Sequence, residues 1–163
     1  ASMNSRDARL VSCSSAAPSP RAAASRPLPA ASRWLWLASF PCTTSRGRWR
    51  LTAREAAKQS RRAWIPEVTP VASAGQVAEL IGKAACAMVL EPGAAASLGR
   101  LSLPESGDLL VVVGPEGGIT GEEGTTFGAA GAVSCRLGPT VLRTSTAGTV
   151  AAAVLLTRSG RWS

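Results

Sequence analysis

Two glycine-containing stretches in the second half of the chain carry the residue types best suited to hold a small molecule. The first, residues 109–118, reads LLVVVGPEGG, so five Leu and Val residues run directly into a loop with three glycines. The second, residues 136–144, reads RLGPTVLRT. Glycine has no Cβ, so such loops allow backbone N–H groups to approach a ligand closely. Because ligands of open α/β sheets bind beyond the carboxyl ends of the strands, the two loops together predict a binding site.

The composition of the first loop limits the kind of ligand. It lacks the spacing and the lysine of a P-loop, and it does not match the G-x-G-x-x-G dinucleotide fingerprint. Glu116 would repel a phosphate, so a neutral or cationic ligand is favoured. The structural alternative is a tight strand-to-helix turn with an exposed Glu116. The chain has no His and no Tyr, so acid–base chemistry would fall to carboxylates, Lys or Arg.

Arg143 stands where the last helix is expected to begin. A cation is unfavourable at that end of a helix because the macrodipole is positive there. An anionic ligand would account for its position. A salt bridge to Glu116 or Glu123 is the structural alternative.

The elements that must position these loops follow from periodicity and capping signals. A buried, parallel strand is expected at 109–113, because a short apolar, β-branched run bounded by turn residues is typical of one. Capping-box spacings at Thr52–Glu55, Ser73–Gln76 and Thr120–Glu123 predict helix starts. The expected helices are 52–62, 73–84, 120–130 and 144–157, and the expected strands are 85–90, 109–113 and 132–136. This order predicts an α/β fold with a largely parallel sheet and helices on both faces.

The helix expected at 120–130 is intrinsically weak. Gly121, Gly124 and Gly128 each cost about 1 kcal/mol relative to Ala in a helix interior. Gly131 is well placed as the left-handed cap at its end.

Residues 1–50 differ in composition from the rest of the chain. They contain eight Arg, no Lys and one Asp, whereas residues 51–163 contain ten basic and nine acidic residues. Ser, Ala, Pro and Arg dominate, a composition that favours disorder because it buries little apolar surface. Three interpretations stand: an organelle transit peptide, an Arg-rich arm that binds nucleic acid, or a misread frame. The predicted organisation is therefore a low-complexity segment, 1–50, followed by one domain, 51–163.

The four cysteines, Cys13, Cys42, Cys86 and Cys135, are far apart and include no C-x-x-C pair. They predict neither a zinc site nor a disulfide framework, but small buried or incidental side chains. No apolar run approaches the 18 residues of a membrane span. We therefore expect no bound metal and no membrane association.

Beyond these local signals, the two glycine stretches resemble a known family. Gly114–Ile119 and Leu137–Ala147 are similar to the carboxy-terminal signature of the RsmE family. These are SPOUT-class methyltransferases that act on N3 of a uridine in small-subunit ribosomal RNA. The likeness extends upstream through Glu55–Arg62 and Ile65–Val68, and so covers about residues 51–162.

The resemblance implies a fold and partners that the periodicity does not give. It implies a parallel sheet tied in a SPOUT-type trefoil knot, although knots are rare in general. It implies a homodimer that binds S-adenosylmethionine (SAM) and methylates a uridine of 16S ribosomal RNA in the small ribosomal subunit. The cytoplasm is the implied compartment, or an organelle if residues 1–50 are a transit peptide.

The resemblance also assigns roles to residues. One wall of the cofactor site would be formed by Gly114, Glu116, Gly117 and Gly118, and the other by Leu137, Gly138, Val141, Leu142 and Arg143. For the reaction itself, our hypothesis is that Arg143 stabilises the charge that develops on O2 and O4 of the uracil or holds a phosphate, with Arg62 as a second RNA contact. No general base is assigned, and Glu116 is the nearest candidate.

The chain departs from the family pattern at several points. The family often has Arg where Thr140 stands and Glu where Ser145 stands, and Gly124 and Gly128 replace leucine-type positions. The PUA-like RNA-binding domain of the family has no counterpart in residues 1–50. The alternative function is therefore a truncated, catalytically weak RNA-binding or assembly module that retains the knot. A third function, ribose 2′-O methylation, usually has an Asn-Glu-Gly loop that Gly114–Gly118 does not match.

Overall fold

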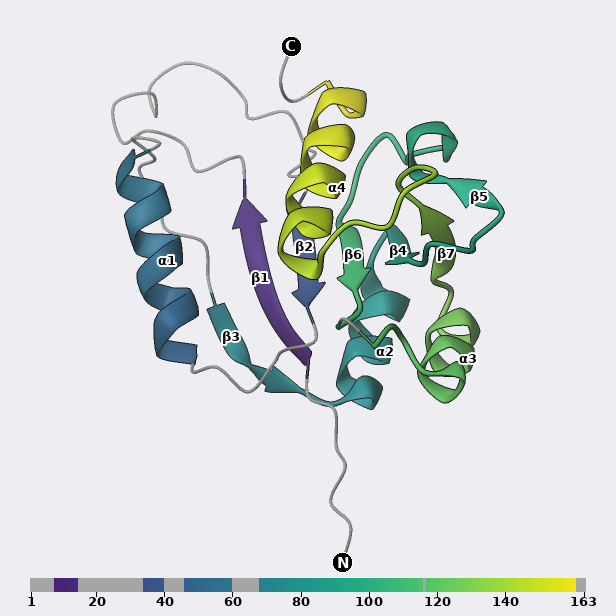
Figure 1. Ribbon diagram of the computed structural model, residues 1–163, viewed down its shortest axis with the longest axis horizontal. Coiled ribbons are helices and arrows are strands. Elements are labelled where there is room, and N and C mark those ends of the chain that lie inside the picture. The colour runs from purple at the N-terminus through teal and green to yellow at the C-terminus, as the bar shows by residue number, and fades with distance from the viewer. Residues whose placement is uncertain (1–7, 15–33, 40–45, 60–67, 116, 161–163) are drawn as a thin grey trace, which may run out of the picture.

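Among the residues that the structure describes, seven strands form one sheet (Figure 1). The computed structural model describes residues 8–14, 34–39, 46–59, 68–115 and 117–160. The strands are β1 (Ala8–Ser14), β2 (Trp34–Ser39), β3 (Val68–Ala72), β4 (Cys86–Leu90), β5 (Ala96–Ser97), β6 (Leu109–Val113) and β7 (Val133–Arg136). The helices are α1 (Arg46–Gln59), α2 (Ala74–Lys83), the 3₁₀ helix η1 (Leu98–Arg100), α3 (Gly121–Ala129) and α4 (Thr144–Arg158).

The sheet is mainly parallel, with an antiparallel side. Its strand order is β3-β1-β2-β6-β4-β7-β5. The pairs β2–β6, β4–β6, β4–β7 and β5–β7 are parallel, whereas β1 pairs antiparallel with both β2 and β3. The predicted α/β class with a largely parallel sheet is confirmed. The trefoil knot stays a prediction from family likeness.

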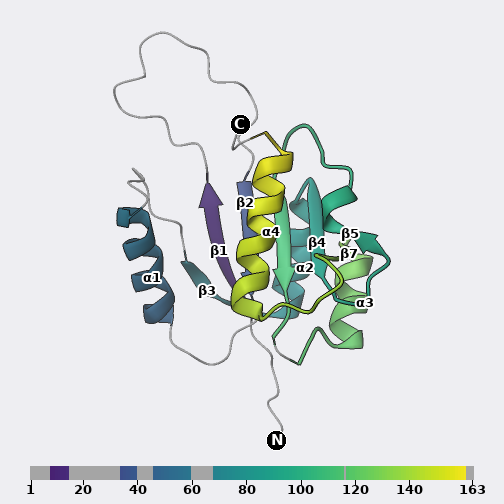
Figure 2. The same cartoon turned by 45° about the horizontal axis from the view of Figure 1, so that its top comes forward.

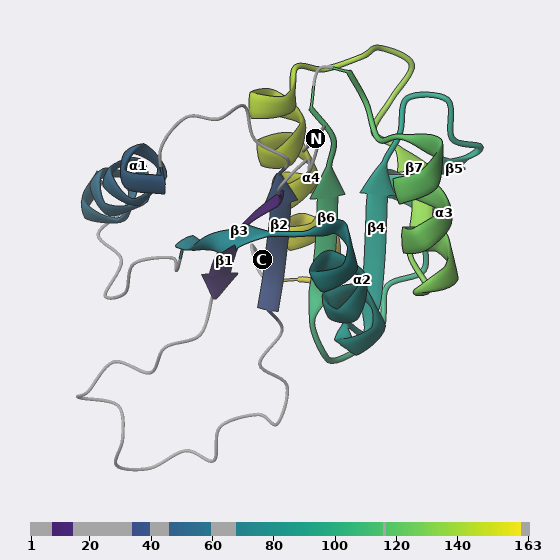
Figure 3. The same ribbon diagram turned by 90° about the horizontal axis from the view of Figure 1, so that it is seen from below.

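Helices cover both faces of the sheet, as predicted. Figures 2 and 3 show α4 on one face, with α2 and α3 on the other. Strand β6 supplies side chains to both layers, because successive residues of a strand point to opposite faces. Leu110 and Val112 belong to the cluster that includes Val77, Ile81 and Phe127. The alternate β6 residues join the cluster under α4, which comprises Met88, Leu98, Leu109, Val111, Val113, Cys135, Ala147, Ala151 and Leu155.

This double burial explains why β6 is apolar throughout. All five of its residues are buried, with exposed fractions between 0% and 4%. Burying one Val or Leu side chain contributes about 1.5–3 kcal/mol. The strand from which the first glycine loop departs is thus firmly fixed between two apolar layers.

Two of the predicted capping boxes are formed. At the start of α2, Gln76 N donates to Ser73 Oγ (3.3 Å) and Ser73 N donates to Gln76 Oε1 (2.9 Å). At the start of α3, Glu123 N donates to Thr120 Oγ1 (3.3 Å) and Thr120 N donates to Glu123 Oε2 (2.8 Å). Gly131 follows α3 with a φ of 100°, so its predicted role as a left-handed cap is also confirmed.

The third predicted capping box is wrong. Helix α1 begins at Arg46, so Thr52 lies in its interior. Glu55 instead accepts a hydrogen bond from Lys58 Nζ at 2.8 Å. Arg and Leu are good helix formers, and they carry the helix back beyond residue 52. The predicted continuation of this helix to residue 62 lies outside the described residues.

The amino-terminal third contains regular structure where its composition predicts none. Strands β1 and β2 lie within residues 1–50, and α1 crosses the predicted domain boundary at residue 50. Strand pairing explains why this segment is ordered although its composition favours disorder. Strand β2 pairs in parallel with β6, with Leu35 opposite Leu109 and Ser39 opposite Val113. The division into two parts stays a prediction.

Strand β3 is a further element that the sequence does not predict. Its central Pro70 argues against a strand, but proline is tolerated at a sheet edge, where β3 lies.

In the described part of the chain, no helix is both long and apolar enough to cross a bilayer.

Candidate functional site

Three strands end side by side at one edge of the sheet. Val113, the last residue of β6, lies opposite Leu90, the last residue of β4. Leu90 in turn lies opposite Cys135 of β7. The loops that follow β6, β4 and β7 therefore leave the sheet at the same place. This is the carboxyl edge, where parallel α/β sheets bind ligands.

A cavity of about 320 Å³ lies between these loops. Its volume falls within the range of small-molecule sites. Its lining combines apolar side chains with the backbone of glycine-containing loops. The lining residues are Leu90, Glu91, Pro92, Val113, Gly114, Pro115, Gly118, Leu137, Gly138, Thr140, Val141, Leu142, Arg143, Thr144 and Ala147.

Most of the residues predicted for the site meet at this cavity. The predicted residues that line it are Gly114, Gly118, Leu137, Gly138, Val141, Leu142 and Arg143. Gly117 is exposed and is not part of the lining. Glu116 and Arg62 lie outside the described residues. The two loops thus face one common space, although the role of each residue stays a prediction.

The sequence did not point to the third loop of the site. Leu90, Glu91 and Pro92 follow β4 and line the cavity. The turn-forming sequence after that strand was a visible signal, but its relevance depends on β4 lying between β6 and β7. Thr140, Thr144, Ala147 and Pro115 are further lining residues that were not predicted.

A side-chain hydrogen bond ties two of the loops together. Thr144 Oγ1 donates to the carbonyl oxygen of Gly114 at 3.1 Å. Thr144 is the first residue of α4, whereas Gly114 is the first residue after β6. Both residues line the cavity, so the bond connects the start of α4 to the first glycine loop within the cavity wall.

The first glycine loop turns back tightly on itself. Gly118 N donates to the carbonyl of Pro115 at 2.8 Å, and Gly118 has a φ of 76°, which favours glycine. A Cβ on Gly114 would lie 3.1 Å from Ile119 Cγ1 and 3.2 Å from the backbone of Gly118 and Ile119. Glycine is therefore favoured at 118 by the backbone conformation and at 114 by close packing.

Arg143 is exposed at the rim of the cavity. It occupies the N-cap position of α4, where its carbonyl accepts from Thr146 N and Ala147 N and its side chain makes no cap bond. Of the two predicted salt-bridge partners, Glu123 makes no ion pair with Arg143 among the described residues and instead accepts a hydrogen bond from Thr120 Oγ1, whereas Glu116 lies outside the described residues. Within the described residues the Arg143 guanidinium makes no ion pair, so its charge is available to a ligand.

Glu91 is the described carboxylate of the lining, and it is exposed. It stands on the loop after β4, whereas the cation of the lining, Arg143, precedes α4. A ligand with separate positive and negative groups would meet complementary charges at the rim. No group of metal-binding side chains occurs among the described residues.

Cys86 and Cys135 pack in the core. Cys135 is fully buried and Cys86 is partly buried, and both are free thiols. Burial raises the pKa of the Cys135 thiol to about 11, with a further contribution from the Cys86 thiol. Both thiols pack in the cluster under α4, as expected for small apolar side chains.

The fold and the cavity define a class of α/β protein with a small-molecule site at the carboxyl edge of a parallel sheet. A family model described as an RNA methyltransferase domain matches residues 42–156. The chain belongs to this RNA methyltransferase family.

Curated relatives support the RsmE resemblance. The chain is 44% identical over 119 residues to the ribosomal RNA small subunit methyltransferase E of Mycobacterium bovis, which covers 71% of this chain and 45% of that protein. It is 38% identical over 109 residues to the protein of the same name from Bacillus subtilis, covering 63% of this chain and 43% of the relative. The chain thus spans less than half the length of these relatives.

Solved structures share the fold. A crystal structure of ribosomal RNA small subunit methyltransferase E from Neisseria gonorrhoeae bound to SAM has a TM-score of 0.62 and 29% identity, covering 74% of this chain and 53% of that one. A putative methyltransferase from Legionella pneumophila in complex with SAM has a TM-score of 0.61 and 27% identity, covering 75% and 53%. The resemblance drawn from the two glycine stretches is confirmed.

Proposed function

We propose that this chain binds SAM in the cavity between its loops and transfers the methyl group to N3 of a uridine in 16S ribosomal RNA. The single observation that carries the proposal is that Gly114–Gly118 and Leu137–Arg143, distant in sequence, line one cavity at the carboxyl edge of the sheet. The names of the relatives and the SAM bound in two structural neighbours support the choice of ligand and reaction.

The lining suits SAM. Leu90, Val113, Leu137 and Leu142 offer apolar surface for a flat adenine ring, and the glycine backbone offers hydrogen-bonding groups at close range. SAM carries an ammonium, a sulfonium and a carboxylate, so Glu91 and Arg143 provide complementary charges at the rim. When bound, SAM supplies a methyl group, and the S–CH₃ bonding electrons remain on the sulfur of S-adenosylhomocysteine.

Within this proposal the two walls have separate tasks. The loop with Gly114, Glu116, Gly117 and Gly118 forms one wall, and its tight turn holds backbone groups in fixed positions. Leu137, Gly138, Val141 and Leu142 form the other wall. Because Gly117 is exposed and outside the lining, we assign it to the shape of the loop rather than to ligand contact.

Arg143 is the residue we propose to act on the substrate. N3 of uridine must lose its proton to become nucleophilic, and negative charge then spreads to O2 and O4. A guanidinium at the cavity rim would stabilise this charge, and such electrostatic stabilisation is often the largest catalytic effect. We propose Arg62 as a second RNA contact and Glu116 as a candidate base.

Nucleoside mass spectrometry tests the proposal. The protein is incubated with small ribosomal subunits lacking the modification and with isotope-labelled SAM, and the RNA is then digested. We expect labelled 3-methyluridine. Label in a 2′-O-methylated nucleoside, or in another base, would contradict the proposed reaction.

The Arg143→Ala variant tests the catalytic assignment. Loss of an electrostatic stabiliser lowers turnover by about 10²–10³-fold, and Arg143→Lys should recover part of it. SAM affinity measured in parallel separates a catalytic defect from a binding defect. An Arg143→Ala protein with the normal rate would end the Arg143 assignment.

Nucleoside mass spectrometry also distinguishes methyl transfer from the alternative function. A wild-type protein that binds SAM and RNA but yields no methylated nucleoside would favour an RNA-binding or assembly module.

We further propose, from family likeness, a homodimer that acts on the small subunit in the cytoplasm. Light scattering of the purified protein tests the dimer.

A further inference from the structure

Helix α1 carries a run of cations spaced four residues apart. Arg46, Arg50, Arg54 and Lys58 follow this spacing, and Arg48 adds another positive charge. Residues four apart lie on neighbouring positions of a helix surface, about 5–6 Å apart at Cβ. Like charges at this spacing repel one another and destabilise the helix. The arrangement is therefore unfavourable unless an anion neutralises it.

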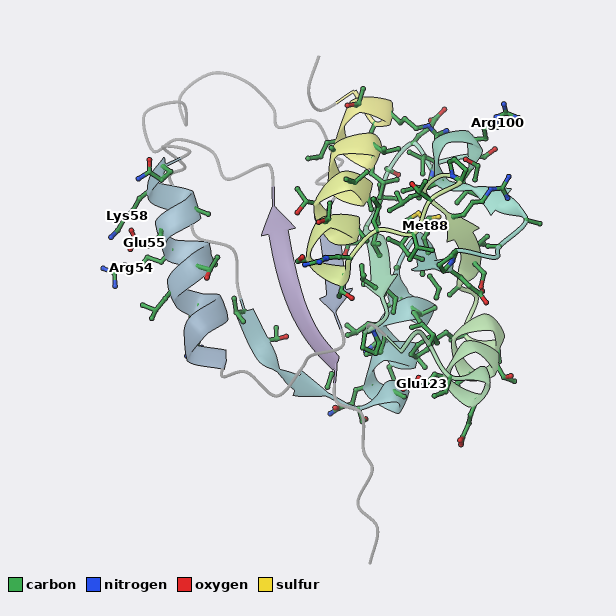
Figure 4. The ribbon with its side chains drawn as sticks, in the orientation of Figure 1. Arg54, Glu55, Lys58, Met88, Arg100 and Glu123 are labelled. Atoms are coloured by element: carbon green, nitrogen blue, oxygen red, sulfur yellow. The ribbon has the colours of Figure 1, made fainter. Side chains whose placement is uncertain are left out.

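The described cations of this run point to solvent. Arg50, Arg54 and Lys58 are exposed, whereas Ala57 is buried at 4% and faces the sheet. Helix α1 packs beside β3, and Figure 4 shows Arg54 and Lys58 directed away from the sheet. The run thus forms one open basic surface, which we call the α1 basic stripe (Arg50, Arg54 and Lys58).

Little acidic charge opposes this stripe. The helix contains one acidic residue, Glu55, which forms a salt bridge of 2.8 Å with Lys58. Lys58 is the main cause of the lowered pKa of Glu55, and Arg54 contributes. Within the described residues, the side chains of Arg50 and Arg54 make no ion pair or hydrogen bond. Their charges are therefore available to an anionic partner.

The first turn of α1 lies toward the same end of the sheet as the cavity (Figure 1). Ser39, the last residue of β2, lies opposite Val113, which lines the cavity. Helix α1 starts at Arg46, shortly after β2, and Figure 1 shows its first turn toward the end of the sheet to which β2 and β6 point. Helix α1 packs beside β3, and β1 and β2 lie between β3 and β6, so an RNA that reaches both α1 and the cavity has to cross this part of the sheet.

We propose that the α1 basic stripe binds the phosphate backbone of the RNA substrate. This inference rests on the proposed function, and adds a second RNA-binding surface, separate from the cavity. Arg and Lys side chains along one surface are the usual phosphate contacts of nucleic-acid-binding proteins. An anionic membrane is the less favoured partner, because a membrane-surface helix needs a broad apolar face. Among the described side chains of α1, Leu51 is the large apolar one that is exposed.

Charge reversal tests the stripe. The variant Arg50→Glu/Arg54→Glu keeps good helix formers, and its new carboxylate at position 54 stands four residues before Lys58, a stabilising order. The matched control is Lys83→Glu/Arg100→Glu, which reverses two exposed cations on α2 and η1. Arg100 lies on the far side of the molecule from Arg54 (Figure 4).

The measurement is the affinity for a fluorescent single-stranded RNA oligonucleotide as a function of salt. The logarithm of the association constant falls as the logarithm of the salt concentration rises. Loss of two phosphate contacts should make this negative slope shallower by about 1.4. We expect at least roughly tenfold weaker binding of the stripe variant at about 0.1 M salt, and a much smaller change in the control. A milder Arg50→Gln/Arg54→Gln variant should show a smaller loss of affinity in the same direction.

The outcomes are distinguishable from those of the proposed function. SAM binding and RNA binding by the wild-type protein report on the function, whereas the difference between the two reversal variants reports on the stripe. Equal losses in both variants, or no loss in the stripe variant, would overturn the inference. Stripe-dependent binding to vesicles containing anionic lipid, with RNA binding unchanged, would assign the surface to a membrane instead. Circular dichroism of each variant establishes that it is folded.

Discussion

The hydroxyl of Thr144 donates a 3.1 Å hydrogen bond to the carbonyl oxygen of Gly114. The two residues are 30 positions apart in the chain, yet both line the cavity. The bond thus joins the first turn of α4 to the loop after β6. The cavity forms only where the folded sheet brings these two segments together.

Replacement of Thr144 by Val should loosen this junction. The substitution keeps the shape but leaves the Gly114 carbonyl without its donor, at a cost of about 1 kcal/mol in the free energy of unfolding. Thr144→Ser retains a hydroxyl and serves as the control. Chemical denaturation and SAM titration measure both effects. Equal stability and equal SAM affinity for Thr144→Val and wild type would show that the bond is unimportant.

Alanine at Gly114 should strain the first loop. Its Cβ would lie 3.1–3.2 Å from Ile119 and Gly118, and two of the three contacts are backbone atoms. We expect a loss of about 1 kcal/mol, within the range of overpacking. Gly93→Ala is the matched control, since a Cβ on this loop glycine meets nothing within 4 Å. Melting temperatures compare the two variants, and a Gly114→Ala protein as stable as Gly93→Ala would refute the close-packing argument.

Helix α3 should gain stability from alanine. Gly124 and Gly128 are exposed in this helix, and a Cβ on either meets nothing within 4 Å. The double variant Gly124→Ala/Gly128→Ala should stabilise the protein by up to about 2 kcal/mol. Gly131→Ala should do the opposite, because Gly131 has a φ of 100°. Thermal unfolding that moves in the same direction for both would contradict the assigned backbone conformations.

The Cys135 thiol should make stability fall at high pH. Burial raises the pKa of Cys135 from 9.0 to about 11 in the folded chain, so the thiol ionises more readily when the chain is unfolded. The stabilising contribution is complete below about pH 9 and is lost as the pH rises toward about 11. Unfolding free energies of wild type and Cys135→Ala across this interval test the prediction. The variant should lose less stability with pH, and identical slopes would show that Cys135 plays no part.

Local signals in the sequence predicted the local structure well. The Ser73–Gln76 and Thr120–Glu123 capping boxes formed because each depends on residues three apart. The five apolar residues of β6 were predicted as a buried strand because burial on both faces removes the alternation of an exposed sheet. Thr52–Glu55 has the same spacing as a capping box, yet it lies within α1, since the preceding residues are also helix formers.

The nonlocal features were harder to predict. The pairing of β2 with β6 depends on an edge that no short sequence window contains. In the same way, the contribution of Leu90, Glu91 and Pro92 to the cavity depends on β4 lying between β6 and β7. The two glycine loops were identified from sequence because glycines after buried strands have a direct physical meaning. Their meeting at one cavity required the strand order.

Calorimetric titration of SAM into wild type and Gly138→Val is the most direct test of cofactor binding between the two glycine loops. Gly138 lines the cavity, and a Cβ there meets no protein atom within 4 Å, so the larger side chain would occupy ligand space without straining the fold. We expect saturable binding of one SAM per wild-type chain, and at least roughly tenfold weaker binding by an equally stable Gly138→Val, which corresponds to about 1.4 kcal/mol. Wild-type protein that is folded but gives no binding heat at about millimolar SAM, or equal affinity in the variant, would contradict this expectation.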